Sequence, residues 1–88
     1  MIPAGDQFGP WALDLDPAEQ RARLRSMQAI VRLTTGPRGE RLADLLRRAE
    51  RDEAALEPAA AALGRLAPID RRHVLTSFAV LHRPEAFR

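Results

Sequence analysis

The sequence predicts an all-α protein, a small antiparallel bundle of three to four short helices preceded by an extended N-terminal arm. Two observations support this prediction. Apolar residues recur at three- and four-residue spacing after residue 16, which is the period of an amphipathic helix. Proline and glycine separate these stretches, where helices usually begin and end. The 88 residues are predicted to form a single domain, with the arm over residues 1–15 and the bundle over 16–84.

The first helix is predicted to begin at the sequence DPAE (residues 16–19) and to end at Gly36. This start combines a capping carboxylate, a proline at the first helical position and a glutamate two residues further on. At the other end, Gly36 suits a left-handed cap and Pro37 cannot continue the helix. The predicted apolar face comprises Leu24, Met27, Ile30, Val31 and Thr34.

The second helix is predicted over about residues 39–56. Its apolar pattern weakens toward the C-terminal end, which we expect to be exposed to solvent. Pro58 breaks or kinks this helix, or it starts a short third helix over 58–67 as its first residue. The apolar face of the second helix comprises Leu42, Leu45, Leu46 and Ala49.

The last helix is predicted over residues 69–82, opened by Pro68 and capped by Asp70, and ended by Pro84. Alternating apolar residues there also permit a strand, but the length and the aspartate favour a helix. Apolar positions of all four segments form the predicted core. These are Leu24, Met27, Ile30, Val31, Leu42, Leu45, Leu46, Leu63, Leu66, Val74, Leu75, Phe78 and Leu81.

Composition limits the classes of function. All fourteen positively charged residues are arginines, and the net charge of +2 is too small to favour a dedicated nucleic-acid binder. There is no cysteine, which excludes disulfides and thiolate metal sites. The sequence contains neither a run of about 18 apolar residues nor a secretory signal, so we expect no membrane span and a cytoplasmic location. The bias toward alanine, leucine and arginine is typical of a bacterial protein.

No catalytic, metal or cofactor motif is found. His73 and His82 are nine residues apart, half a turn out of phase on a helix, so they cannot chelate one ion within a chain. No cysteine, lysine or tyrosine is present to act as nucleophile or general acid. The sequence TTGPRGER (residues 34–41) lacks the spacing and the lysine of a phosphate-binding loop and is read as a turn. The chain is therefore predicted to be no enzyme and to bind no cofactor or small-molecule ligand.

One segment favours an alternative function, DNA binding. Arg71, Arg72 and His73 fall in the first turn of a helix that follows a short helix and a tight turn, where helix-turn-helix proteins present base-reading residues. The sequence AAALGRLAPIDRRHVL (residues 60–75) resembles the opening of the fourth region of bacterial sigma factors over sixteen residues. The resemblance implies a DNA-binding regulator, although no second recognition helix follows in the sequence.

The N-terminal arm is the best sequence clue to a partner. The segment FGPWALDLD (residues 8–16) alternates apolar and acidic residues, which is the period of an extended chain. Its large apolar side chains have to be covered, on the helices of the same chain, on a second copy or in a groove of another protein. These side chains are Phe8, Trp11, Leu13 and Leu15.

A basic stripe on the first helix, formed by Arg21, Arg25 and Arg32, would meet the acidic face of the arm or an acidic partner. The sequence thus predicts a non-catalytic protein-interaction module, such as a small adaptor, accessory subunit or regulatory protein. Its partner is another protein or a second copy of the chain, as in a homodimer. The alternatives are a small DNA-binding transcriptional regulator and a structural component of a larger assembly.

Overall fold

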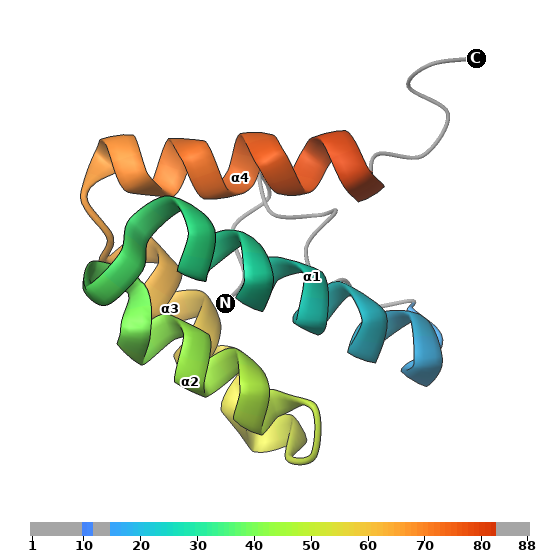
Figure 1. The fold of residues 1–88 in the computed structure, drawn as a ribbon. Coiled ribbons are helices and arrows are strands. Elements are labelled where there is room, and N and C mark those ends of the chain that lie inside the picture. The colour runs from blue at the N-terminus through green and yellow to red at the C-terminus, as the bar shows by residue number, and fades with distance from the viewer. Residues whose placement is uncertain (1–9, 12–14, 83–88) are drawn as a thin grey trace.

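The computed structural model describes residues 10–11 and 15–82, and this part of the chain is all-α, with no strand. Two short 3-10 turns and four α-helices follow one another along it (Figure 1). None of these helices is long and apolar enough to cross a membrane. The helices are α1 (Pro17–Thr35), α2 (Glu40–Ala49), α3 (Leu56–Gly64) and α4 (Pro68–His82), and the 3-10 turns are η2 (Gly36–Gly39) and η3 (Glu53–Ala55).

Helix α1 begins and ends where the sequence predicts. The Asp16 carboxylate accepts hydrogen bonds from the backbone N–H groups of Ala18 and Glu19, at 3.1 and 3.2 Å. These bonds satisfy two of the donors that a helix start leaves unpaired. Gly36 has a positive φ of 57°, as expected, but its ψ of −134° is not that of a left-handed helix. The chain therefore does not stop at a simple cap but continues into η2.

Helix α2 is shorter than predicted, and the expected single helix over residues 39–56 is wrong. It ends at Ala49, and a turn separates it from η3. Asp52 has an extended backbone, and its carboxylate accepts a hydrogen bond from the backbone N–H of Ala54 at 3.0 Å. This aspartate starts a new element, as an N-cap does. The next helix, α3, begins at Leu56, so Pro58 lies inside its first turn, where a missing N–H costs little.

Residues 68–82 form a helix, α4, and not a strand. The expected capping role of Asp70 is wrong, because Asp70 is the third residue of the helix. The first backbone bond runs instead from the N–H of Arg71 to the carbonyl of Ala67, at 2.9 Å. The side chain of Asp70 points into the structure, where it is 4% exposed.

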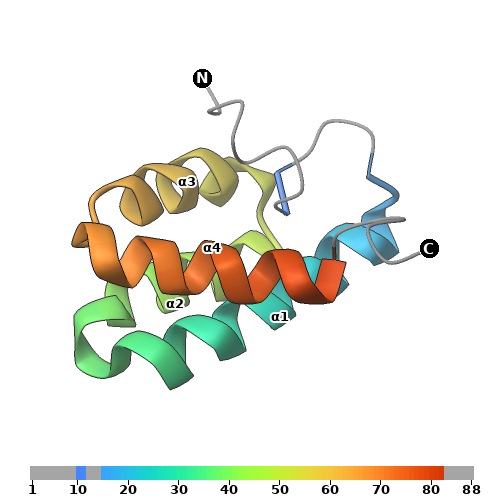
Figure 2. The same cartoon turned by 90° about the horizontal axis from the view of Figure 1, so that it is seen from above.

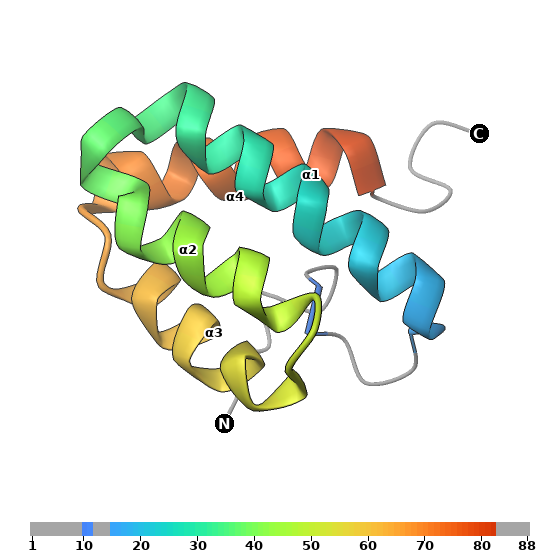
Figure 3. The ribbon, with the colours of Figure 1, turned by 60° about the horizontal axis from the view of Figure 1, so that its bottom comes forward.

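Helix α1 organises the fold, because it packs against both α2 and α4, while α3 packs against α2 (Figures 1 and 3). Helices α3 and α4 diverge and make little direct contact with each other (Figure 2). Residues 10 and 11 enter on this side of the molecule. Trp11, which precedes α1 in the sequence, therefore packs between α3 and α4.

The buried core contains most of the predicted large apolar residues, together with five alanines outside that prediction, at positions 43, 49, 55, 59 and 62. Leu81 was predicted to be buried but is 63% exposed, because it lies near the C-terminal end of α4. Trp11 was not among the predicted core residues but is only 2% exposed. The predicted residues found buried are Leu24, Met27, Ile30, Val31, Leu42, Leu46, Leu63, Val74 and Phe78, with Leu45, Leu66 and Leu75 partly buried against them.

Candidate interaction surfaces

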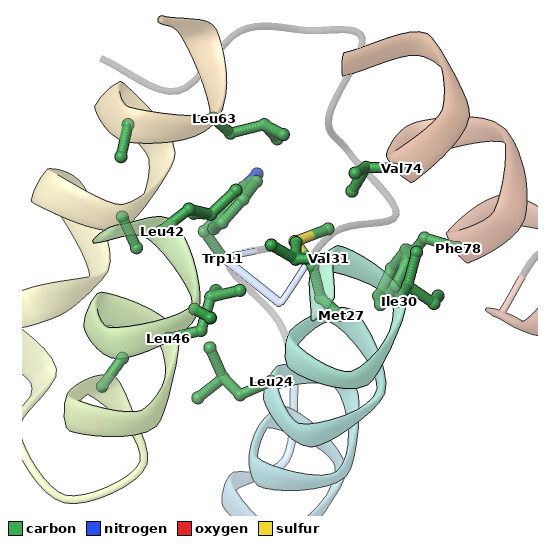
Figure 4. Close-up of a cluster of buried hydrophobic side chains, with 14 of the residues drawn as sticks. Trp11, Leu24, Met27, Ile30, Val31, Leu42, Leu46, Leu63, Val74 and Phe78 are labelled. Carbon is green, nitrogen blue, oxygen red and sulfur yellow. The ribbon is translucent and has the colours of Figure 1, made fainter. Parts of the chain in front are cut away.

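Trp11 occupies the centre of the core. Figure 4 shows its ring among Leu63 of α3, Leu42 of α2 and Val74 of α4. A single hydrogen bond fastens the neighbouring residue to α1, from Nε2 of Gln20 to the carbonyl of Pro10 at 3.1 Å. The Nε1 group of Trp11 is buried and has no hydrogen-bond partner among the residues that the structure describes. The indole therefore acts as an apolar wedge that joins the outer helices.

The other predicted arm residues are only partly covered by the structure. Pro10 and Trp11 form a turn, where an extended segment was expected. Phe8 and Leu13 lie outside the described residues, and Leu15 is half-buried just before α1. Among the described arm residues, Trp11 thus contacts its own chain.

The basic stripe of α1 is exposed, and one of its members is already paired. Arg25 donates from Nε to Oε1 of Glu50, just after α2, at 2.8 Å. Arg21 and Arg32 make no ion pair within residues 10–11 and 15–82. Asp16, the acid expected to face this stripe, caps α1 instead. In the described part of the chain, the acid that reaches the stripe is therefore Glu50.

The three residues proposed for DNA contact are in different environments. Arg71 donates from Nη1 to the backbone carbonyl of Gly64 at 2.9 Å and so ties the end of α3 to α4. A cation is favourable there, because the C-terminal end of a helix carries partial negative charge. Arg72 and His73 are exposed to solvent. Only the last two thus present their side chains freely, whereas Arg71 has a structural partner.

An ion pair that the sequence did not reveal joins the exposed Arg38 of η2 to the buried Asp70 of α4. Arg38 donates from Nε to Oδ2 of Asp70 at 2.8 Å and from Nη2 to Oδ1 at 2.9 Å. These hydrogen bonds lower the pKa of Asp70 against the opposing effect of desolvation, and the charges of Arg38 and His73 lower it further. The same hydrogen bonds raise the pKa of Arg38. The pair keeps the buried carboxylate ionised and holds the Arg38 guanidinium in one orientation.

Beside this ion pair lies a small depression, which we call the basic hollow. Its volume is about 130 Å³. Arg41 and Arg65 at its rim are exposed and make no ion pair with any described residue. Two larger hollows, of about 420 and 430 Å³, include acidic side chains among their lining residues. The basic hollow is lined by Arg38, Arg41, Leu42, Ala62, Arg65 and Leu66.

Helix α4 also carries an outer face without carboxylate or guanidinium groups, defined by Ile69, His73, Thr76 and Val80. These four residues are exposed, and at 100° per residue they fall within about 60° of one another around the helix. Ile69 is 65% exposed and Val80 is 63% exposed. The segment from 73 to 82 contains no aspartate, glutamate, lysine or arginine, although charged residues make up 30% of the chain. Of the four large apolar residues that are exposed in the described chain, three lie on α4, and the fourth, Leu33, lies on α1.

The described part of the chain forms no metal centre, and the sequence shows no similarity to a known protein. In the part of the chain that the structure describes, no three histidine, aspartate or glutamate side chains are grouped so as to hold a metal ion. His73 is exposed, and the side chain of His82 lies outside the description. Compared with models of protein families, with curated proteins and with solved structures, the chain matches none.

Proposed function

We propose that this chain is a non-catalytic protein-interaction module, a small adaptor, accessory subunit or regulatory protein of the cytoplasm. In this proposal a small antiparallel bundle with an N-terminal arm presents the outer face of α4 to a partner protein. The observation that supports it best is the exposure of Val80 within residues 73–82, a segment of α4 without aspartate, glutamate or arginine. Ile69 is exposed on the same face, next to the charged residues 70–72.

The physical argument concerns the cost of removing this face from water. Isolated exposed apolar residues are ordinary on any protein, but an apolar group on one element marks a contact site. The centres of protein interfaces are depleted of charged residues, because a buried charge needs a partner. On the outer face of α4 a partner would desolvate methyl groups, a hydroxyl and an imidazole, and no charged carboxylate or guanidinium. The opposite face of α4 packs on α1, so the helix is held in place before binding.

The arm has a supporting role in this proposal. Trp11 is packed between the helices of its own chain, which favours the first of the three positions considered for the arm. The module then docks through a helix face, while the arm stabilises the helices that form it.

The test is a pull-down of the tagged chain from its native host, read by mass spectrometry with and without nuclease. Val80→Glu places a charge at the C-terminal end of the outer face, and Ala54→Glu places the same charge on exposed η3 as a control. We expect a protein recovered in near-equal amount by the wild type and Ala54→Glu, with or without nuclease, and lost with Val80→Glu. Equal recovery by all three chains would refute docking on α4.

A second candidate function is DNA binding by the first turn of α4, because Arg72 and His73 are exposed there. This function predicts retardation of duplex DNA at low salt, with a steep loss of binding as the salt concentration rises. Absence of binding at about 50 mM salt would exclude it. Partners that disappear from the pull-down after nuclease treatment would favour it.

A further inference from the structure

We infer that the basic hollow binds a carboxylate from an acidic protein segment, a glutamate or aspartate side chain next to apolar residues. The inference rests on the proposed function in that the ligand is a protein, and it adds a second contact surface with defined chemistry. The basic hollow is formed by η2, α2 and α3, so it is a different surface from the outer face of α4.

The positive charge of the basic hollow favours an anionic ligand. Three guanidinium groups border one small hollow, and those of Arg41 and Arg65 have no acidic partner among the described residues. Like charges that share a confined site repel one another unless an anion lies between them. Arginine is the side chain best suited to a carboxylate, because its planar fork can donate two parallel hydrogen bonds.

One of the three arginines, Arg38, is held in position by Asp70 before any ligand binds. Asp70 takes the Nε and Nη2 donors of Arg38, which leaves Nη1 for another acceptor. A side chain held in this way loses little further entropy when a ligand binds. Arg38 can therefore serve two roles, as partner of the buried aspartate and as a fixed side of the hollow.

The basic hollow also has apolar residues in its lining and a small volume. Leu42 and Ala62 are 1% and 6% exposed, and Leu66 is partly buried beside them. The hollow has a volume of about 130 Å³ and opens to solvent. It accommodates a carboxylate with its short hydrocarbon stem against the partly buried Leu66.

The surroundings favour a protein over a nucleic acid. On its other side Arg41 borders a hollow where Arg32 and Arg47 alternate with Glu40 and Asp44. Asp44 pairs with Arg47 and with Arg48, so acidic side chains interrupt the arginines along α2. A nucleic-acid backbone is a long row of phosphates and needs an extended positive surface. The net charge of +2 supplies no such field over the whole chain. A single carboxylate with apolar neighbours matches both the confined charge and the apolar lining.

The experiment is a titration of the full ¹⁵N-labelled chain with a short blocked peptide of glutamate and leucine, followed by NMR. A peptide with glutamine in place of glutamate is the ligand control. We expect the signals of Arg41 and Arg65 to shift, and either Arg41→Gln or Arg65→Gln to weaken binding about tenfold, as loss of a charge-assisted hydrogen bond does. Arg51→Gln, which replaces an exposed arginine just after α2, should leave the affinity within about twofold. Arg38 is left intact, because its removal would strand the Asp70 carboxylate.

Three results would overturn the inference. The first is equal binding of the glutamine and glutamate peptides. The second is a loss of binding in Arg51→Gln as large as in the two substitutions at the hollow. The third is tighter binding of a short DNA duplex at the same salt concentration. The same titration of Val80→Glu separates this site from α4, because the peptide should bind that variant as it binds the wild type. Loss of peptide binding and loss of the partner on α4 are thus independent outcomes. Fluorescence emission from the single tryptophan of the chain checks that each variant is folded.

Discussion

At the scale of single residues, Trp11 is the buried side chain that packs between α3 and α4. Trp11→Ala is expected to lower the free energy of unfolding by about 3–5 kcal/mol, because a buried tryptophan leaves a large cavity. Trp11→Phe should cost less than half as much, since it keeps most of the apolar volume and removes an N–H that has no acceptor among the described residues. Urea denaturation followed by far-ultraviolet circular dichroism measures both variants. An unchanged melting temperature and oligomeric state in Trp11→Ala would contradict this role.

The buried Asp70 carboxylate predicts a dependence of stability on pH. Its pKa is lowered by the hydrogen bonds from Arg38, so the ion pair stabilises the fold above the ordinary carboxyl pKa of about 3.9. This contribution is lost as the pH falls below that value and through the lower pKa of the folded state. Asp70→Asn is therefore expected to be less stable than the wild type at pH 7, and the difference should shrink in acid, where the protonated aspartate resembles asparagine. Denaturation of both proteins across this pH range is the measurement, and a difference that stays constant down to pH 2 would exclude the ion pair as its cause.

Neither residue could be assigned from the sequence, for one physical reason. Asp70 near a helix start has the pattern of a cap, but its partner lies 32 positions earlier and is brought to it by the packing of α4 on α1. Trp11 has the pattern of an extended arm, yet its environment is built from all four helices. Local spacing carries no information about such contacts. The basic hollow escaped the sequence analysis on the same ground, because its three arginines come from η2, from α2 and from the loop after α3.

At the scale of elements, the connection between α1 and α2 depends on a close approach at Gly39. A Cβ atom there would collide with the hydroxyl of Thr35 and a methyl group of Val31. Gly39→Ala is therefore expected to cost about 1–3 kcal/mol through overpacking. The matched control is Gly64→Ala at the end of α3, where a Cβ meets nothing within 4 Å, and this change should stabilise the protein by about 0.5–1 kcal/mol. Chemical denaturation followed by Trp11 emission compares them, and equal effects of the two changes would rule out the close approach.

The elements themselves were predictable where their signals were local. The start of α1 combines a capping aspartate with a proline, and the structure has the helix there. The boundary between α2 and α3 was missed because no glycine or proline marks it, and Pro58, taken as the breaker, lies in the first turn of α3. Asp52 was the overlooked signal, since an aspartate before Glu53-Ala54-Ala55 can cap a new turn.

At the scale of the whole molecule, the helices are unequally supported. Helix α1 packs on both α2 and α4, whereas α3 packs on α2 and on the wedge of Trp11. Opening of α3 exposes less buried surface than opening of α1. We therefore expect the free energy of opening α3 to be smaller than the free energy of global unfolding.

Native-state hydrogen exchange measures this difference directly. The amides of Ala62 and Leu63 in α3 should exchange through local opening, while those of Met27 and Val31 in α1 should exchange only with global unfolding. Trp11→Phe should lower the protection of α3 more than that of α1, because the wedge supports the outer helix from one side. Equal protection in α1 and α3, or an equal loss of protection in the variant, would mean that the four helices unfold as one unit. The outer face of α4 would then owe its position to the whole core, and a partner bound there would protect every helix to the same degree.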